Sequence, residues 1–143
     1  MSLEVNLICG GQHTDHRGTL YFVNDFDMSE VKRMYMISHS DTTVRRGWRA
    51  HQLEQRWFCV VQGSFELKLV KIDDWDKPDQ NLAMETFILS ADNPQVIHIP
   101  VGYATGFRAL IPDSRVMVYA DKGIAEAKFD DHQYPADYFH RWE

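Results

Sequence analysis

The chain has 143 residues and a formal net charge of −6 at pH 7, with 44% apolar and 25% charged residues. This is the composition of a soluble globular protein rather than of a disordered chain. The acidic balance argues against non-specific nucleic-acid binding, because contacts to phosphates need a basic face. The longest uninterrupted apolar stretch is only "WFCVV" (57–61), and no signal peptide is recognised. We therefore expect a cytoplasmic protein that has neither nucleic acid nor a membrane as a partner.

Short apolar or alternating runs separated by turn signals recur along the chain, and long helical periodicity is absent. This pattern is typical of an all-β sandwich or barrel, and the length fits one domain over residues 1–143. The predicted strands are residues 19–24, 31–38, 56–62, 65–71, 82–89, 96–99, 103–110 and 115–120.

The segments between these strands carry further predictions. "QGS" (62–64) separates two strong runs and predicts a hairpin turn. The polar stretch 73–81 predicts a solvated loop, with a lid as the alternative. Residues 135–142 predict a short C-terminal helix, in which the spacing of Tyr138, Phe139 and Trp142 would pack their rings on the sheet.

The two cysteines, Cys9 and Cys59, are too few for a disulfide scaffold, and no CxxC motif is present. One bridge between them is possible, but two reduced thiols are the expectation for a cytosolic protein.

The segment "VRRGWRAHQLEQ" (44–55) concentrates positive charge in this acidic chain. On an extended strand Arg49 and His51 share one face, whereas strict alternation places Arg46 on the other face. A bulge at Gly47 would redirect Arg46 toward the first face. Such a group of arginines predicts a local positive cavity for an anionic ligand.

Several blocks resemble, in the right order, the small cupin enzymes of nucleotide-sugar metabolism. These blocks are "DHRGTL" (15–20), "VKRMYMIS" (31–38), "RRGWRAHQLEQ" (45–55) and "LSADNPQVIHIPVGYATGF" (89–107). The resemblance is strongest to the dTDP-sugar 3,4-ketoisomerases and more distant to the dTDP-4-dehydrorhamnose 3,5-epimerases. It implies a single-domain cupin jelly-roll barrel without a cofactor and a homodimer, often with a swapped N-terminal strand.

The resemblance also implies roles for individual residues. His51 would be a catalytic base, since imidazole can remove a proton next to a ketone at neutral pH, and Tyr35 would assist it. The implied substrate-binding residues are Arg17, Arg46, Arg49 and Tyr119. Each has a structural alternative: a surface charge for the arginines, a core ring for the tyrosines, and a hydrogen-bonded sheet residue for His51.

Two departures from the family pattern concern histidines. Arg49 stands in place of the first histidine of the family's H-A-H, and Thr105 in place of a later histidine. An arginine cannot act as a base. His51 and Glu54 alone are too few to hold a transition metal stably, so we predict no metal site.

These observations predict a cofactor-free isomerase that catalyses 3,4-ketoisomerisation or epimerisation of a nucleotide-linked 4-keto-6-deoxy sugar, in polysaccharide biosynthesis. The missing histidines favour the alternative of a catalytically degenerate cupin module that binds a nucleotide sugar without turnover.

Overall fold

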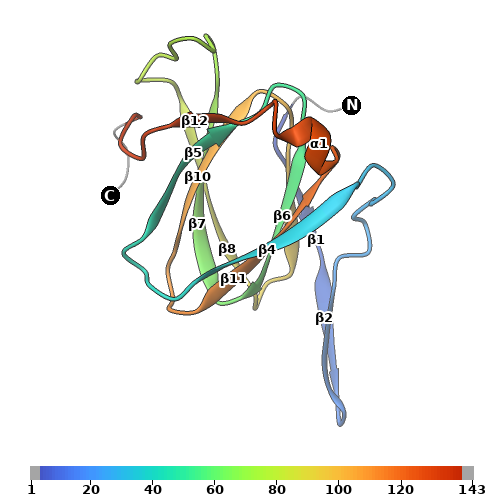
Figure 1. Cartoon of the computed structure of the whole chain (residues 1–143). Coiled ribbons are helices and arrows are strands. Elements are labelled where there is room, and N and C mark those ends of the chain that lie inside the picture. Colours follow the sequence, from blue (N-terminus) through green and yellow to red (C-terminus); the bar gives the residue numbers. More distant parts are fainter. Residues whose placement is uncertain (1–3, 140–143) are drawn as a thin grey trace.

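Two five-stranded antiparallel sheets curve around a common interior and form a barrel (Figure 1). The computed structural model describes residues 4–139. The first sheet has the order β1-β9-β6-β11-β4, and its strands are β1 (Asn6–Cys9), β9 (Gln95–Ile99), β6 (Arg56–Gln62), β11 (Ser114–Ala120) and β4 (Arg33–His39). The second has the order β12-β5-β10-β7-β8, and its strands are β12 (His132–Tyr134), β5 (Arg45–Ala50), β10 (Tyr103–Ala109), β7 (Ser64–Lys71) and β8 (Met84–Ser90). The all-β fold class is therefore confirmed.

The core lies between the inner faces of the two sheets. Alternation along each strand supplies it: on β11, Val116 and Val118 are buried, while Arg115 points outward. Phe58 on β6 and Phe107 on β10 meet edge to face across the interior, with ring centroids 5.8 Å apart. This packed part of the barrel supports the cavity described below.

All eight predicted strands are present, with small shifts of their ends. The strands β1, β2 (Gly11–Asp15), β5 and β12 were not in the predicted set, although residues 45–51 were treated as extended. The prediction of a hairpin turn at residues 62–64 is wrong, because β6 and β7 belong to different sheets. Gly63, with φ of +72°, instead turns the chain from one sheet to the other.

The C-terminal segment differs from its prediction. Residues 136–139 form a turn rather than a helix, and residues 140–142 lie outside the described part. A single helical turn, α1 (Ile124–Ala127), lies earlier in the chain. The predicted packing of Phe139 is confirmed: its buried ring meets Trp48 edge to face, with a centroid distance of 4.9 Å, on the outer side of the second sheet. The chain from α1 through β12 crosses one end of the barrel (Figure 1), and Phe139 anchors the residues that follow.

A two-stranded hairpin of β2 (Gly11–Asp15) and β3 (Gly18–Phe22) projects from the barrel (Figure 1). Leu20 and Tyr21 on this hairpin are exposed. Strand β4 forms an edge of the first sheet and exposes Met34 and Met36. Hydrophobic side chains are therefore presented both on the hairpin and on a sheet edge.

Cys9 and Cys59 are both free thiols. Over residues 4–139, no helix has the length and apolar character needed to cross a membrane.

Candidate active site

A cavity of about 750 Å³ lies between the two sheets, at the barrel end crossed by α1 and β12. Strands β4, β5, β6 and β10 all contribute side chains to its wall. Four of the six predicted site residues line it: Tyr35, Arg46, Arg49 and His51. The structure therefore brings together residues from separate parts of the sequence in one cavity.

A bulge in β5 determines which of its side chains reach the cavity. Opposite β10, Ala50 and Arg49 pair with Ala104 and Thr105, but the register then shifts by one residue, so that Arg46 pairs with Phe107. Gly47 and Trp48 together oppose a single residue of β10. The extra residue turns Arg46 to the same side as Arg49, as a bulge at Gly47 predicts. The Arg46 guanidinium lies over the Phe107 ring, 5.9 Å from its centroid.

His51 follows directly after β5 and is 8% exposed. Its Nδ1 lies 2.7 Å from the backbone oxygen of Asp130. A carbonyl oxygen only accepts hydrogen bonds, so Nδ1 carries the hydrogen and Nε2 carries the free lone pair. Burial, reinforced by the positive charge of Arg56, lowers the pKa of His51 to about 4. At neutral pH the ring is therefore an uncharged base with a fixed tautomer.

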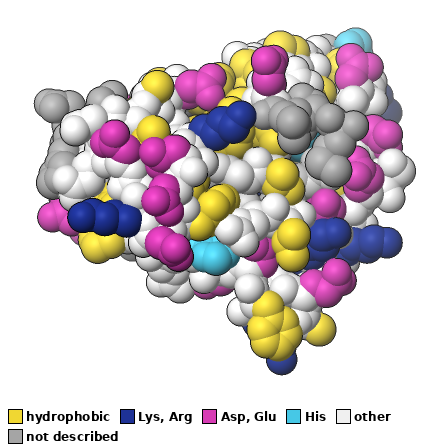
Figure 2. All heavy atoms as spheres, turned by 90° about the horizontal axis from the view of Figure 1, so that it is seen from above, with side chains coloured by type: hydrophobic (Ala, Val, Ile, Leu, Met, Phe, Trp, Pro, Cys, Tyr) yellow, Lys and Arg dark blue, Asp and Glu magenta, His cyan; other side chains and the backbone are white. Residues whose placement is uncertain are grey.

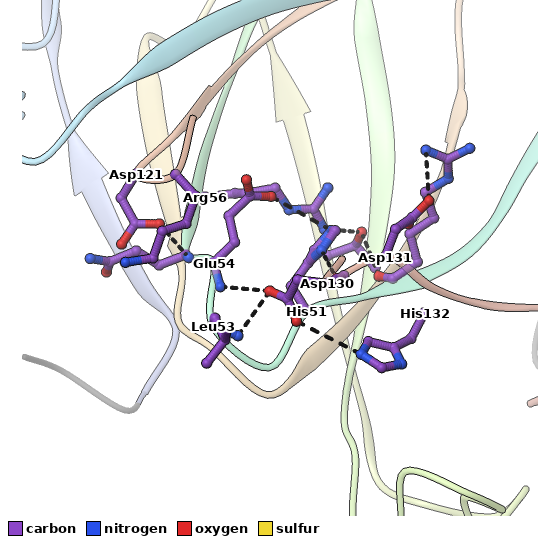
Figure 3. A network of polar contacts seen from close by, with 12 residues as sticks. His51, Leu53, Glu54, Arg56, Asp121, Asp130, Asp131 and His132 are labelled. Carbon is purple, nitrogen blue, oxygen red and sulfur yellow. Dashed lines mark hydrogen bonds and ion pairs between the residues drawn. The ribbon is translucent and has the colours of Figure 1, made fainter. Parts of the chain in front are cut away.

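Asp130 fixes the turn that carries His51, as Figure 3 shows. Its carboxylate, in a residue only 3% exposed, accepts hydrogen bonds from the backbone N–H groups of Gln52, Leu53 and Glu54 at 2.8, 2.9 and 2.9 Å. Its own carbonyl orients the His51 ring. One residue of the C-terminal segment therefore holds both the backbone and the imidazole in place.

Glu54 lies beside His51 and is 2% exposed. Its Oε1 accepts a hydrogen bond of 2.8 Å from Arg33 on β4, and its Oε2 lies 3.8 Å from Nε2 of His51. Burial raises the pKa of the Glu54 carboxyl, against the opposing effect of Arg33 and Arg56. The base and a buried carboxyl group thus share one wall of the cavity.

Arg56 places a buried positive charge on the same wall. It is 5% exposed, its NH2 group donates to the Thr105 hydroxyl at 2.7 Å, and its guanidinium lies over the Phe58 ring, 5.2 Å from its centroid. Among the described residues, the hydrogen-bond partner of this NH2 group is a hydroxyl and not a carboxylate. The positive charge of Arg56 acts on the neighbouring Glu54 carboxyl without a direct ion pair among the described residues, and an anionic group of a ligand would compensate that charge further.

Two predicted site residues lie elsewhere. Arg17 is at the tip of the projecting hairpin, its side chain 78% exposed, and it pairs with Asp15 at 2.7 Å. Tyr119 points away from the cavity, because alternation along β11 directs Val118 and Ala120 inward and Tyr119 outward. Its ring instead packs against Phe26, with centroids 5.3 Å apart. Within one chain, neither residue contributes to the cavity wall.

The surface over the cavity end does not form a broad basic face. Seen from above, acidic side chains are spread over this end, and Lys and Arg side chains gather in only a few places (Figure 2). The positive charge instead lines the cavity, through Arg46 and Arg49 of the arginine segment and through Arg56 on β6. Across residues 4–139, no group of three or more His, Cys, Asp or Glu side chains is arranged to hold a metal ion.

Sequence reasoning did not identify Arg56 or Asp130 as site residues. Arg56 begins the apolar run "RWFCVV", where a buried cation is an exception that could have been noticed. Asp130 lies 79 positions after His51, and its contact depends on how the C-terminal segment folds back. No local pattern carries that information.

Comparison with known proteins agrees with this fold. The fold and cavity define a cupin-type barrel of the kind found in nucleotide-sugar epimerases and ketoisomerases. The family model described as "WxcM-like, C-terminal" (FdtA) matches residues 4–141, so the chain belongs to this family. No curated protein matches the sequence.

Solved structures share the fold at low identity. The rmlC epimerase of Mycobacterium tuberculosis matches with a TM-score of 0.77 and 21% identity, over 96% of this chain and 74% of that one. A 3,4-ketoisomerase from Helicobacter canadensis gives 0.68 and 19%, over 96% of each chain. A mutant of the 3,4-ketoisomerase QdtA from Thermoanaerobacterium thermosaccharolyticum, in complex with TDP-4-keto-6-deoxyglucose, gives 0.71 and 20%, over 97% and 94%.

Proposed function

We propose that this protein is a cofactor-free isomerase that catalyses 3,4-ketoisomerisation or epimerisation of a nucleotide-linked 4-keto-6-deoxy sugar. One observation supports this above the others: an uncharged, tautomer-fixed imidazole shares a buried wall with the guanidinium of Arg56. Family membership supports the same chemistry, because structures with this fold include sugar epimerases and 3,4-ketoisomerases. We propose cytoplasmic polysaccharide biosynthesis as its setting.

The proposed chemistry begins with proton removal by His51. Nε2 takes the proton from a carbon next to the sugar ketone, and the electron pair of that C–H bond moves toward the carbonyl oxygen. Arg56 supplies fixed positive charge where negative charge develops on that oxygen. Return of the proton to the former carbonyl carbon, with transfer of the neighbouring hydroxyl proton to the former carbonyl oxygen, gives the ketoisomer, and return to the opposite face of the same carbon gives the epimer. Tyr35, from β4, lines the same cavity and is proposed to hydrogen-bond a sugar hydroxyl.

We propose that the diphosphate lies toward Arg46 and Arg49 on β5. A guanidinium can contact two phosphate oxygens at once. Arg49 is half-exposed and has only a loose ion pair, 3.8 Å from Asp131. This leaves its charge available to an anionic ligand.

Binding of dTDP tests the shared basis of the enzyme and of a non-catalytic binding module. We expect dTDP or a dTDP-sugar to raise Tm by linkage, and Arg46→Ala to weaken dTDP affinity by roughly tenfold or more, since it removes a charge-assisted contact. Thermal denaturation and titration calorimetry measure both effects. Arg115→Ala is the control, because alternation directs Arg115 away from the cavity. Identical melting curves with and without every nucleotide would contradict the proposal.

We also propose that the protein is a homodimer. The projecting β2–β3 hairpin exposes Leu20 and Tyr21, and the edge strand β4 exposes Met34 and Met36. A second copy would cover these side chains and the open strand edge. Exchange of the hairpin between two copies would also carry Arg17 away from its own barrel to the partner.

Sedimentation velocity at micromolar concentration tests this assembly. We expect roughly twice the monomer mass for the wild type, and a shift toward monomer for Leu20→Glu, which places a charge on the hairpin. Ile88→Glu is the matched control, because Ile88 is equally apolar and exposed but lies on β8. A monomeric wild type, or equal effects of both variants, would contradict this arrangement.

A further inference from the structure

Glu54 has an unusual environment for a carboxyl group. Arg33 holds Oε1, but within residues 4–139 no hydrogen-bond partner meets the buried Oε2. That oxygen faces Nε2 of His51 at 3.8 Å and lies in the cavity wall. A buried carboxylate oxygen without a partner costs free energy, whereas a protonated one is neutral and can donate to a ligand. The geometry therefore suits a group that exchanges a proton.

The electrostatic surroundings act on the two groups in complementary directions. Burial lowers the pKa of His51 and raises the pKa of Glu54. Both groups are thereby moved toward their neutral forms, a base and an acid side by side. Arg33, Arg56 and His51 face the Glu54 carboxyl from neighbouring elements, and Asp121 adds negative charge that also raises its pKa.

We propose that Glu54 is the second acid–base group of this site, exchanging protons with the sugar oxygens while His51 exchanges them with the sugar carbons. This inference rests on the proposed function and extends it, because it makes the site a 3,4-ketoisomerase rather than an epimerase. Nε2 of His51 and Oε2 of Glu54 lie 3.8 Å apart, so the two atoms can contact C3 of the sugar and the oxygen on C4 at the same time. It also gives the site a second proton carrier although Arg49 and Thr105 replace two histidines of the family pattern.

The proposed reaction balances without an added reactant. In the first half, the C3–H bond breaks, its proton joins Nε2 of His51, and its electron pair forms the C3–C4 double bond. The former C4 carbonyl oxygen takes the proton of the Glu54 carboxyl, giving an enediol. In the second half, the Glu54 carboxylate takes the proton of the C3 hydroxyl, which becomes the ketone, while the imidazolium returns its proton to C4. Both side chains are restored.

Glu54→Gln separates this role from a merely structural one. Glutamine keeps the size and an acceptor for Arg33 but cannot release a proton as an acid does. With dTDP-4-keto-6-deoxyglucose in D₂O, we expect the variant still to exchange the hydrogen at C3, although more slowly than the wild type, because His51 is intact and the glutamine amide can donate a hydrogen bond to the C4 oxygen without transferring a proton. We expect formation of the 3-keto product to fall about 100-fold or more. Proton NMR follows exchange and product in one sample.

The matched control is Glu66→Gln, which removes a carboxylate that accepts from Arg108 at 2.9 Å and lies outside the cavity. A readout that needs no substrate is the infrared carbonyl band of a protonated carboxyl in the free protein. We expect this band to disappear in Glu54→Gln and to persist in Glu66→Gln.

The outcomes distinguish the two levels of the proposal. If the wild type shows no exchange at C3 and forms no 3-keto product, the proposed function itself is overturned. Exchange in the wild type without 3-keto product, equal loss of exchange and product in Glu54→Gln, or a missing infrared band would overturn the role of Glu54 alone.

Discussion

Replacing His51 by asparagine is expected to reduce turnover about 10²- to 10⁴-fold, the usual contribution of a positioned general base. Asparagine keeps a hydrogen-bond donor for the Asp130 carbonyl but has no basic nitrogen. Binding of dTDP should remain nearly unchanged, because Arg46 and Arg49 hold the ground state whereas His51 acts in the transition state. Product formation by NMR and dTDP affinity by calorimetry measure the two effects separately.

His13→Asn is the matched control, since His13 is exposed on β2 of the projecting hairpin and lies outside the cavity wall. Unchanged turnover in His51→Asn would show that His51 is not the catalytic base, and Tyr35 would become the next candidate. A parallel loss of dTDP affinity would show that the variant disturbs the pocket rather than the chemistry.

Asp130→Ala is expected to lower the free energy of unfolding by about 3 kcal/mol or more. The substitution removes a buried carboxylate and leaves the backbone N–H groups of residues 52–54 without their acceptor. Charge-assisted hydrogen bonds are worth about 1.5–3 kcal/mol each, and the losses at one turn are not additive. Urea denaturation of the variant and the wild type measures the difference.

Asp131→Ala provides the comparison for that stability measurement. Asp131 is adjacent in sequence, but its carboxylate makes only exposed contacts among the described residues: an ion pair of 3.8 Å with Arg49 and a hydrogen bond of 2.9 Å from the Gln133 side chain. We expect a change within about 0.5 kcal/mol, as for an exposed ion pair. Equal destabilisation by both variants would mean that Asp130 does not hold the turn as described.

The strands and part of the site could be predicted because they depend on local patterns. Alternation predicts where β10 and β11 lie, and it places Arg49 and His51 on one face. Gly47 in the arginine segment indicated the bulge that brings Arg46 to the cavity, which the register of β5 and β10 confirms. Each of these features is determined by residues close together in the chain.

The features that the sequence could not predict depend on contacts between distant segments. The short turn at Gly63 predicts a hairpin, but the residues around it do not determine that β7 pairs in a different sheet from β6. The family resemblance implies a site role for Tyr119, whereas its position in the alternation along β11 turns its ring away from the cavity of its own chain. Asp130 reaches His51 only through the fold of the C-terminal segment, and Glu54 gains its environment from Arg33 on another strand.

Hydrogen exchange in D₂O tests the central claim most directly. The wild-type protein is incubated with dTDP-4-keto-6-deoxyglucose, and proton NMR follows the hydrogens on the carbons next to the ketone. Proton abstraction by His51 predicts deuterium at C3 or a new keto sugar, at a rate well above that of the sugar alone. Saturating binding of the nucleotide sugar with no exchange and no new product would contradict the enzyme proposal and identify the protein as a non-catalytic nucleotide-sugar-binding module.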